Sequence, residues 1–166
     1  MSTYTLETKL FGEIEVTQSD GLIADFDIVL GGKDMSVNFQ VFEDVANDDT
    51  IEIIENMLDN IPLMYEKGKE IILTEKESNA IIKSFIEDYF DDIDEYAELF
   101  DVNSSNEITT TMIAKNLEPR SIFITNDNDD MIDCIFDFSL SEEYTDQLLV
   151  ISFNDKYEIC HITHES

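Results

Sequence analysis

Apolar and polar residues alternate along the first forty positions of the chain, which is typical of strands with one buried face. The clearest alternation puts five apolar side chains on one face, namely Leu22, Ala24, Phe26, Ile28 and Leu30. Residues 31–34, which begin with two glycines, predict a turn into a second strand with Met35, Val37, Phe39 and Val41. The pattern predicts a β-hairpin, preceded by a strand from Tyr4 to Val16 that is interrupted at Gly12.

Helical periodicity replaces this alternation between about residues 50 and 117. A first helix is indicated by apolar residues three or four positions apart, namely Ile51, Ile54, Leu58 and Ile61. Pro62 suits the first turn of a second helix that runs towards Ile71, because proline lacks the amide hydrogen that is unsatisfied there anyway. A shorter helix is expected from Ile108 to Asn116.

The third helix of this region has the longest apolar stripe in the chain. Thr74 and Glu77 have the spacing of a capping box and predict its start. The stripe consists of Ile81, Ile82, Phe85, Ile86, Tyr89, Phe90, Ile93, Tyr96, Ala97 and Phe100. The opposite side carries eight acidic residues with no basic residue between them, which we call the acidic ridge: Glu87, Asp88, Asp91, Asp92, Asp94, Glu95, Glu98 and Asp101.

Alternation returns after Pro119 and predicts four strands over residues 121–125, 131–140, 148–153 and 157–164. Strands followed by helices and again by strands indicate an α+β fold. We expect residues 1–166 to form a single domain, with a C-terminal four-stranded antiparallel meander and the helices packed on one side of the sheet. Whether the early and late strands share one sheet is left open by the pattern.

The ionic balance limits the partners that the protein can bind. Its 39 Asp and Glu residues against 9 Lys and Arg give a formal net charge of -30. Such a chain repels phosphate backbones and anionic lipids, so we expect no binding to nucleic acid or membrane. This charge fits a protein that binds a basic protein partner. It also fits a protein whose surface charge only keeps it soluble. Arg120 is the only arginine, which rules out a clamp of several guanidinium groups.

The N-terminus lacks the basic and apolar regions of a signal peptide, and no apolar run approaches the length of a membrane span. These features predict a cytoplasmic protein. Cys134 and Cys160 lie in strand-like apolar segments, where free thiols are usual in a reducing compartment, so we expect no disulfide.

Motifs for cofactor, metal or covalent chemistry fit poorly. The glycines form no phosphate-binding loop, and Cys160 and His161 are neighbours on a strand and should point to opposite faces. His161 and His164, three positions apart, should also diverge. We therefore expect no cofactor and no metal.

Three groups of acidic residues are candidate metal-binding or catalytic sites. The loop at residues 126–130 is rich in oxygen ligands, but it lacks the glycine and glutamate of a calcium-binding loop and indicates an ordinary turn. Two pairs of carboxylates each share a strand face, one of Asp25 and Asp27 and the other of Asp133 and Asp137. In so acidic a chain, a solvated sheet face explains both pairs.

Three stretches resemble a known family: residues 10–14 (LFGEI), 145–150 (TDQLLV) and 164–166 (HES). With the order of elements, they make the chain similar to the bacterial domain-of-unknown-function family 2004. The resemblance implies a bacterial cytosolic protein, similar in style to the small acidic domains that are encoded beside bacterial toxins. It implies no catalytic residues.

These observations favour a non-enzymatic protein-binding module, such as an immunity-type inhibitor of a basic partner that contacts the acidic ridge. Two alternatives remain. One is a metal-dependent hydrolase that uses clustered carboxylates, and the other is a structural or accessory domain that associates with itself.

Overall fold

The computed structural model describes residues 2–18, 21–41, 48–126, 131–141 and 145–165. The chain begins with a hairpin of β1 (Ser2–Thr8) and β2 (Gly12–Gln18), which pair from Ser2↔Gln18 to Thr8↔Gly12. The prediction of one interrupted strand from Tyr4 to Val16 is therefore wrong. The Thr8 hydroxyl donates to the Gly12 carbonyl at 2.9 Å and accepts from the Phe11 amide at 3.0 Å, and Gly12 has a φ of 72°. These features close a turn where the sequence suggested only an irregularity.

The predicted second hairpin is confirmed. It consists of β3 (Leu22–Leu30) and β4 (Lys33–Val41), which pair along their whole length. Gly31 and Gly32 form a two-residue turn with φ values of 60° and 79°. Turns of this kind need positive φ at both positions, which glycine adopts without steric cost.

The first two predicted helices are present as α1 (Asp48–Asp59) and α2 (Ile61–Thr74), with Pro62 in the first turn of α2. Helix α3 (Ala80–Asp88) begins later than the capping box predicts. Its N-cap is Asn79, whose side chain accepts from the amides of Ile81 and Ile82 at 3.0 and 3.1 Å. Thr74 instead ends α2, where its hydroxyl donates to the Glu70 carbonyl.

The long third helix is also shorter than predicted. After α3 the chain continues as short elements: η1 (Tyr89–Asp92), α4 (Ile93–Tyr96), η2 (Ala97–Leu99) and η3 (Ser105–Glu107). Carboxylates are unfavourable near the C-terminus of a helix, and like charges three or four positions apart repel. Acidic side chains occupy the last turn of α3 with no basic residue there, which explains why the regular helix ends. Helix α5 (Thr110–Asn116) then matches the predicted short helix.

The four late strands form the predicted antiparallel meander of β5 (Glu118–Thr125), β6 (Asp133–Ser139), β7 (Leu148–Phe153) and β8 (Ile159–Glu165). Strand β4 pairs with β5 in parallel, so the strands form one eight-stranded sheet in the order β1 to β8. The early and late strands thus share a sheet, which is mixed and not purely antiparallel. The helical segment between β4 and β5 supplies the crossover that a parallel pair requires.

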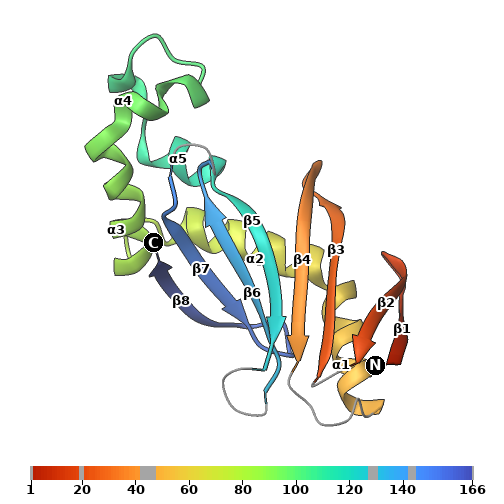
Figure 1. Cartoon of the computed structure of the whole chain (residues 1–166). Coiled ribbons are helices and arrows are strands. Elements are labelled where there is room, and N and C mark those ends of the chain that lie inside the picture. Colours follow the sequence, from red (N-terminus) through yellow and green to blue (C-terminus); the bar gives the residue numbers. More distant parts are fainter. Residues whose placement is uncertain (1, 19–20, 42–47, 127–130, 142–144, 166) are drawn as a thin grey trace.

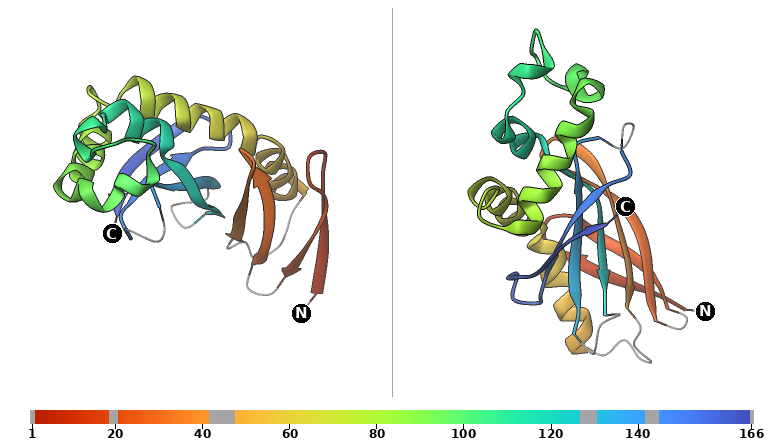
Figure 2. Two further views of the ribbon diagram at one scale, coloured as in Figure 1. Left: turned by 90° about the horizontal axis from the view of Figure 1, so that it is seen from above. Right: turned by 90° about the vertical axis from the view of Figure 1, so that its left-hand side faces the viewer.

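The helices lie on one side of the sheet, as predicted, and α2 runs across the strands (Figures 1 and 2). Gly68 of α2 is buried, and a Cβ atom there would lie 2.9 Å from Cζ of Phe138 and 3.8 Å from Cζ of Phe153. Both phenylalanines are fully buried. The glycine thus lets α2 approach the aromatic core closely, and this fixes the height of the helical layer over the sheet.

Candidate functional site

All eight residues of the acidic ridge are exposed, but they do not lie on one helix. Glu87 and Asp88 end α3, and the others follow on η1, α4, η2 and the segment after it. Glu87 lies 3.9 Å from the Lys83 ammonium, and Asp94 accepts a hydrogen bond from the Ser105 hydroxyl. The prediction of a continuous acidic helix face is therefore wrong, although the residues remain a run of exposed carboxylates.

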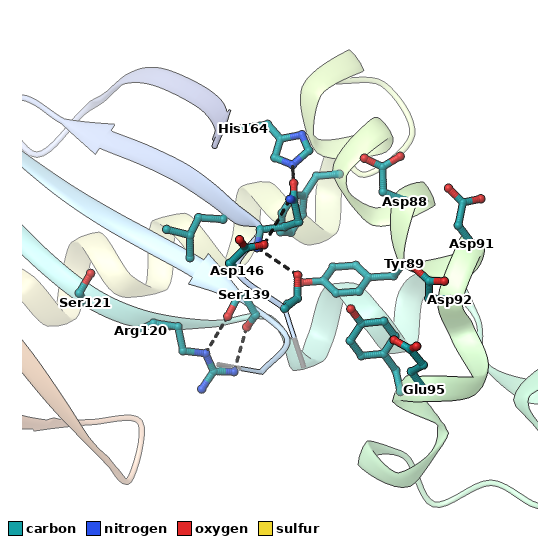
Figure 3. Close-up of a pocket in the computed structure, with 15 residues that line it drawn as sticks. Asp88, Tyr89, Asp91, Asp92, Glu95, Arg120, Ser121, Ser139, Asp146 and His164 are labelled. Carbon is teal, nitrogen blue, oxygen red and sulfur yellow. Dashed lines mark hydrogen bonds between the residues drawn. The ribbon is translucent and has the colours of Figure 1, made fainter. Parts of the chain in front are cut away.

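A cleft of about 910 Å³ separates the ridge region from the end of the sheet (Figure 3). Four ridge residues line one wall of it, namely Asp88, Asp91, Asp92 and Glu95. Asp146, Gln147 and His164 line it from the β6–β7 connection and β8. Glu87, Asp94, Glu98 and Asp101 are not among the lining residues, so the structure brings half of the predicted ridge to a common cavity.

Aromatic rings form the base of the ridge wall. Tyr89 packs edge-on against Phe85 and Tyr96, with ring centroids 5.4 and 5.0 Å apart. His164 packs edge-on against Phe85 at 5.2 Å, and its ring nitrogen Nε2 lies 2.6 Å from the Gln147 side-chain oxygen. The rings of Phe85, Tyr89 and Tyr96 are buried, so they anchor this wall, and the exposed carboxylates beside them form its surface.

Two tyrosines of this cluster are neutral at physiological pH. Burial raises the pKa of Tyr89 to about 12, and its hydroxyl accepts a hydrogen bond from the Leu140 amide at 3.0 Å. Burial also raises the pKa of Tyr96, and the negative charges of Glu95 and Asp92 raise it further. The aromatic base therefore adds no charge to the cleft.

Arg120 also lines the cleft, and its guanidinium group donates hydrogen bonds to a hydroxyl and to backbone carbonyls at the end of β6. Nε donates to the Ser139 hydroxyl at 3.0 Å, and Nη2 donates to the carbonyls of Ser139 and Leu140 at 3.0 and 2.7 Å. Within the described part of the chain, none of the five carboxylates that line the cleft forms an ion pair with a lysine, arginine or histidine. With one arginine and five carboxylates among its lining residues, the cleft is strongly acidic.

Sequence reasoning found the ridge wall of the cleft but missed the opposite wall. Asp146, Gln147 and His164 come from the end of the chain, and only the fold places them beside η1. Residues 145–150 are part of the resemblance to a known family, but no pattern in the sequence predicts a binding role for Asp146. The sequence shows that Arg120 is the only arginine, but no local pattern predicts its hydrogen bonds to backbone carbonyls.

The other candidate residues lie elsewhere. Cys134 is buried and Cys160 is exposed, and both are free. The Cys160 thiol donates to the Ser152 carbonyl at 3.4 Å, and desolvation followed by the charge of Asp133 raises its pKa. A raised pKa disfavours the thiolate that a nucleophile needs. His161 pairs with Ser152 across the ladder, whereas His164 pairs with Leu149, so the two histidines lie on different faces as predicted.

The described residues contain no group of three or more His, Cys, Asp or Glu side chains placed to hold a metal ion. Of the oxygen-rich loop considered as a calcium site, residues 127–130 lie outside the described part of the chain. The pairs Asp25–Asp27 and Asp133–Asp137 both lie on the face of the sheet away from the helices, as their cross-strand partners show. Among the helices of the described ranges, none is long and apolar enough to cross a membrane.

No protein-family model, curated protein or solved structure matches the chain. The resemblance to domain-of-unknown-function family 2004 gains no support from these comparisons and stays a prediction.

Proposed function

We propose that the protein is a non-enzymatic binding module for a basic protein partner, of which an immunity-type inhibitor is one example. The observation that carries the proposal is the cleft, where five carboxylates form no ion pair with the residues that the structure describes. Lysine and arginine side chains of a partner would find opposite charges there. The net charge of -30 would also steer such a partner towards the protein.

The metal-dependent hydrolase is the weaker candidate. It requires clustered ligands, and the described residues bring no three of them together. The charges of His161 and Asp155 act on Asp133, but within the described ranges these side chains do not form a group placed to hold a metal ion. No specific observation favours this function over binding.

A triple variant, Asp91→Asn with Asp92→Asn and Glu95→Gln, tests the cleft. All three side chains are exposed, so the fold should tolerate the changes. The probe is hexa-arginine, followed by basic proteins encoded beside the gene, titrated by calorimetry at 50 and 300 mM NaCl. We expect the wild-type affinity to fall about tenfold or more as salt rises, because screening weakens contacts between exposed charges. The triple variant should bind at least tenfold more weakly at low salt.

The matched control changes three exposed acids far from the cleft: Glu13→Gln and Glu15→Gln on β2 and Glu52→Gln on α1. Both variants have the same net charge, so the comparison separates local contact from general attraction. Equal weakening in the two would show that only the overall charge acts. Tight binding that ignores salt and both sets of changes would contradict the proposal.

A further inference from the structure

The face of the sheet away from the helices carries no covering element in the described structure (Figure 2). Cross-strand pairing defines its side chains row by row. One row runs from Asp27 through Ser36, Ser121, Asp137 and Val150 to Thr163. The next row contains Asp25, Asn38, Phe123, Ile135, Ser152 and His161. We call the outward side chains of β3 to β8 the open face.

The open face is mostly acidic. Its acidic residues are Asp25, Asp27, Asp34, Asp133, Asp137 and Glu165. The paired outward positions of the described strands β3 to β8 hold no lysine or arginine, but Arg120 at the bulge of β5 donates to the outward Ser139 hydroxyl. Six carboxylates thus outnumber the one arginine at the edge of this face.

The middle of the open face is hollowed. A groove of about 350 Å³ has four apolar lining residues, Ile122, Phe123, Ile135 and Val150, and four polar ones, Asn38, Ser121, Asp137 and Glu165. Phe123 and Ile135 are directly paired across β5 and β6 and are half-buried. Further out on β3, Ile23 and Val29 are 43 % and 67 % exposed. An apolar floor between acidic margins is the complement of an amphipathic segment with basic flanks.

We propose that the open face is a second docking surface, which binds a protein segment whose apolar side chains are flanked by lysine or arginine. The proposal takes the class of partner, a basic protein, from the function proposed above. Charge complementarity selects this occupant. A second copy of the chain would bring twelve carboxylates together against two arginines, and nucleic acid or anionic lipid would meet the same repulsion.

The probe is an 18-residue amphipathic peptide of leucine and lysine, titrated into isotopically labelled protein and followed by amide chemical shifts. Hexa-lysine, which lacks the apolar side, is the comparison. We expect the amphipathic peptide to shift amides of β5, β6 and β7, and hexa-lysine to shift those around Asp91 and Asp92. The paired variant Phe123→Thr with Ile135→Thr should weaken binding of the amphipathic peptide about fivefold or more.

Val29→Thr is the matched control, because it makes the same kind of change on the same face but outside the groove. It should leave binding within about twofold of wild type. Thermal unfolding of each variant, followed by circular dichroism, verifies that the compared proteins are folded, and the single changes Phe123→Thr and Ile135→Thr replace the pair if it unfolds.

The outcomes separate the two proposals. If the peptide shifts only residues around the cleft, and the groove variants bind as wild type, the open face is not a docking surface while the cleft proposal stands. If the groove variants lose binding and the cleft triple variant does not, the open face stands and the cleft fails. Concentration-dependent shifts at β5 to β7 without peptide would overturn the proposal in favour of self-association.

Discussion

Removing the hydroxyl group of Tyr89 should loosen the connection between the ridge wall of the cleft and the end of β6. Tyr89 is 4 % exposed, and its hydroxyl accepts from the amide of Leu140, which is 6 % exposed. Tyr89→Phe keeps the ring and its edge-on contacts with Phe85 and Tyr96. The loss is confined to one hydrogen bond, and a buried amide without an acceptor costs about 1–3 kcal/mol. We expect the free energy of unfolding at pH 7 to fall by that amount.

The same substitution has a signature at alkaline pH. Burial raises the pKa of Tyr89 from 10.0 to about 12, so folding favours the neutral phenol. A group with a raised pKa stabilises the fold fully below its unfolded pKa, and this stabilisation is lost as pH rises through the folded pKa. A shift of this size corresponds to about 3 kcal/mol. Wild type should therefore lose about that much more stability than Tyr89→Phe between pH 10 and 12.

Urea denaturation, followed by circular dichroism at pH 7 and at steps from pH 9 to 12, measures both effects. The difference between the two proteins is the relevant quantity, because other tyrosines and lysines titrate in both. Tyr4→Phe on β1, where the tyrosine is 37 % exposed, is the control and should be within about 0.5 kcal/mol of wild type. If Tyr89→Phe is as stable as wild type at pH 7 and follows the same alkaline profile, the assigned hydrogen bond and the buried phenol are wrong.

Two further substitutions test the fold that holds the cleft. Asn79→Ala should cost about 1 kcal/mol, because it removes the cap of α3, whereas Thr74→Ala should change little; equal costs in urea denaturation would contradict the observed start of α3. Gly68→Ala should destabilise, because overpacking against the Phe138 ring costs about 1–3 kcal/mol and the gain in helix propensity is only about 1. In a Phe138→Leu background the cost of Gly68→Ala should shrink, and strictly additive effects in a double-mutant cycle would refute the close contact.

Local patterns predicted most strands and the first two helices, because alternation and helical periodicity report directly which side of an element is buried. They failed where the deciding contact was not periodic. The turn at Gly12 depends on a single hydroxyl of Thr8, and the start of α3 depends on the side chain of Asn79. In both places a few hydrogen bonds to nearby atoms outweighed the hydrophobic pattern.

Long-range pairing was the other limit. The parallel alignment of β4 with β5 joins residues that are far apart in the sequence, such as Val37 and Ile122, which are 85 positions apart. No pattern within either strand identifies the strand with which it pairs. The cleft has the same origin, since Asp146 and His164 meet the ridge only because β6, β7 and β8 continue the sheet under α3. The sequence therefore predicted half of the site, the half that is contiguous along the chain.

The positions of the cleft carboxylates follow from the aromatic residues between them. Phe85, Tyr89 and Tyr96 must be buried, and this fixes the rotation of α3, η1 and α4 about their axes. The acidic residues between the rings are then held at the surface beside the cleft, where repulsion among them persists because none of those that line the cleft forms an ion pair with a described lysine or arginine. Anchoring and charge are thus carried by different side chains. Tyr89→Phe should reduce stability without changing the charge, and the triple variant should reduce partner binding without disturbing the rings, so a loss of binding in the second variant alone would trace recognition to the carboxylates.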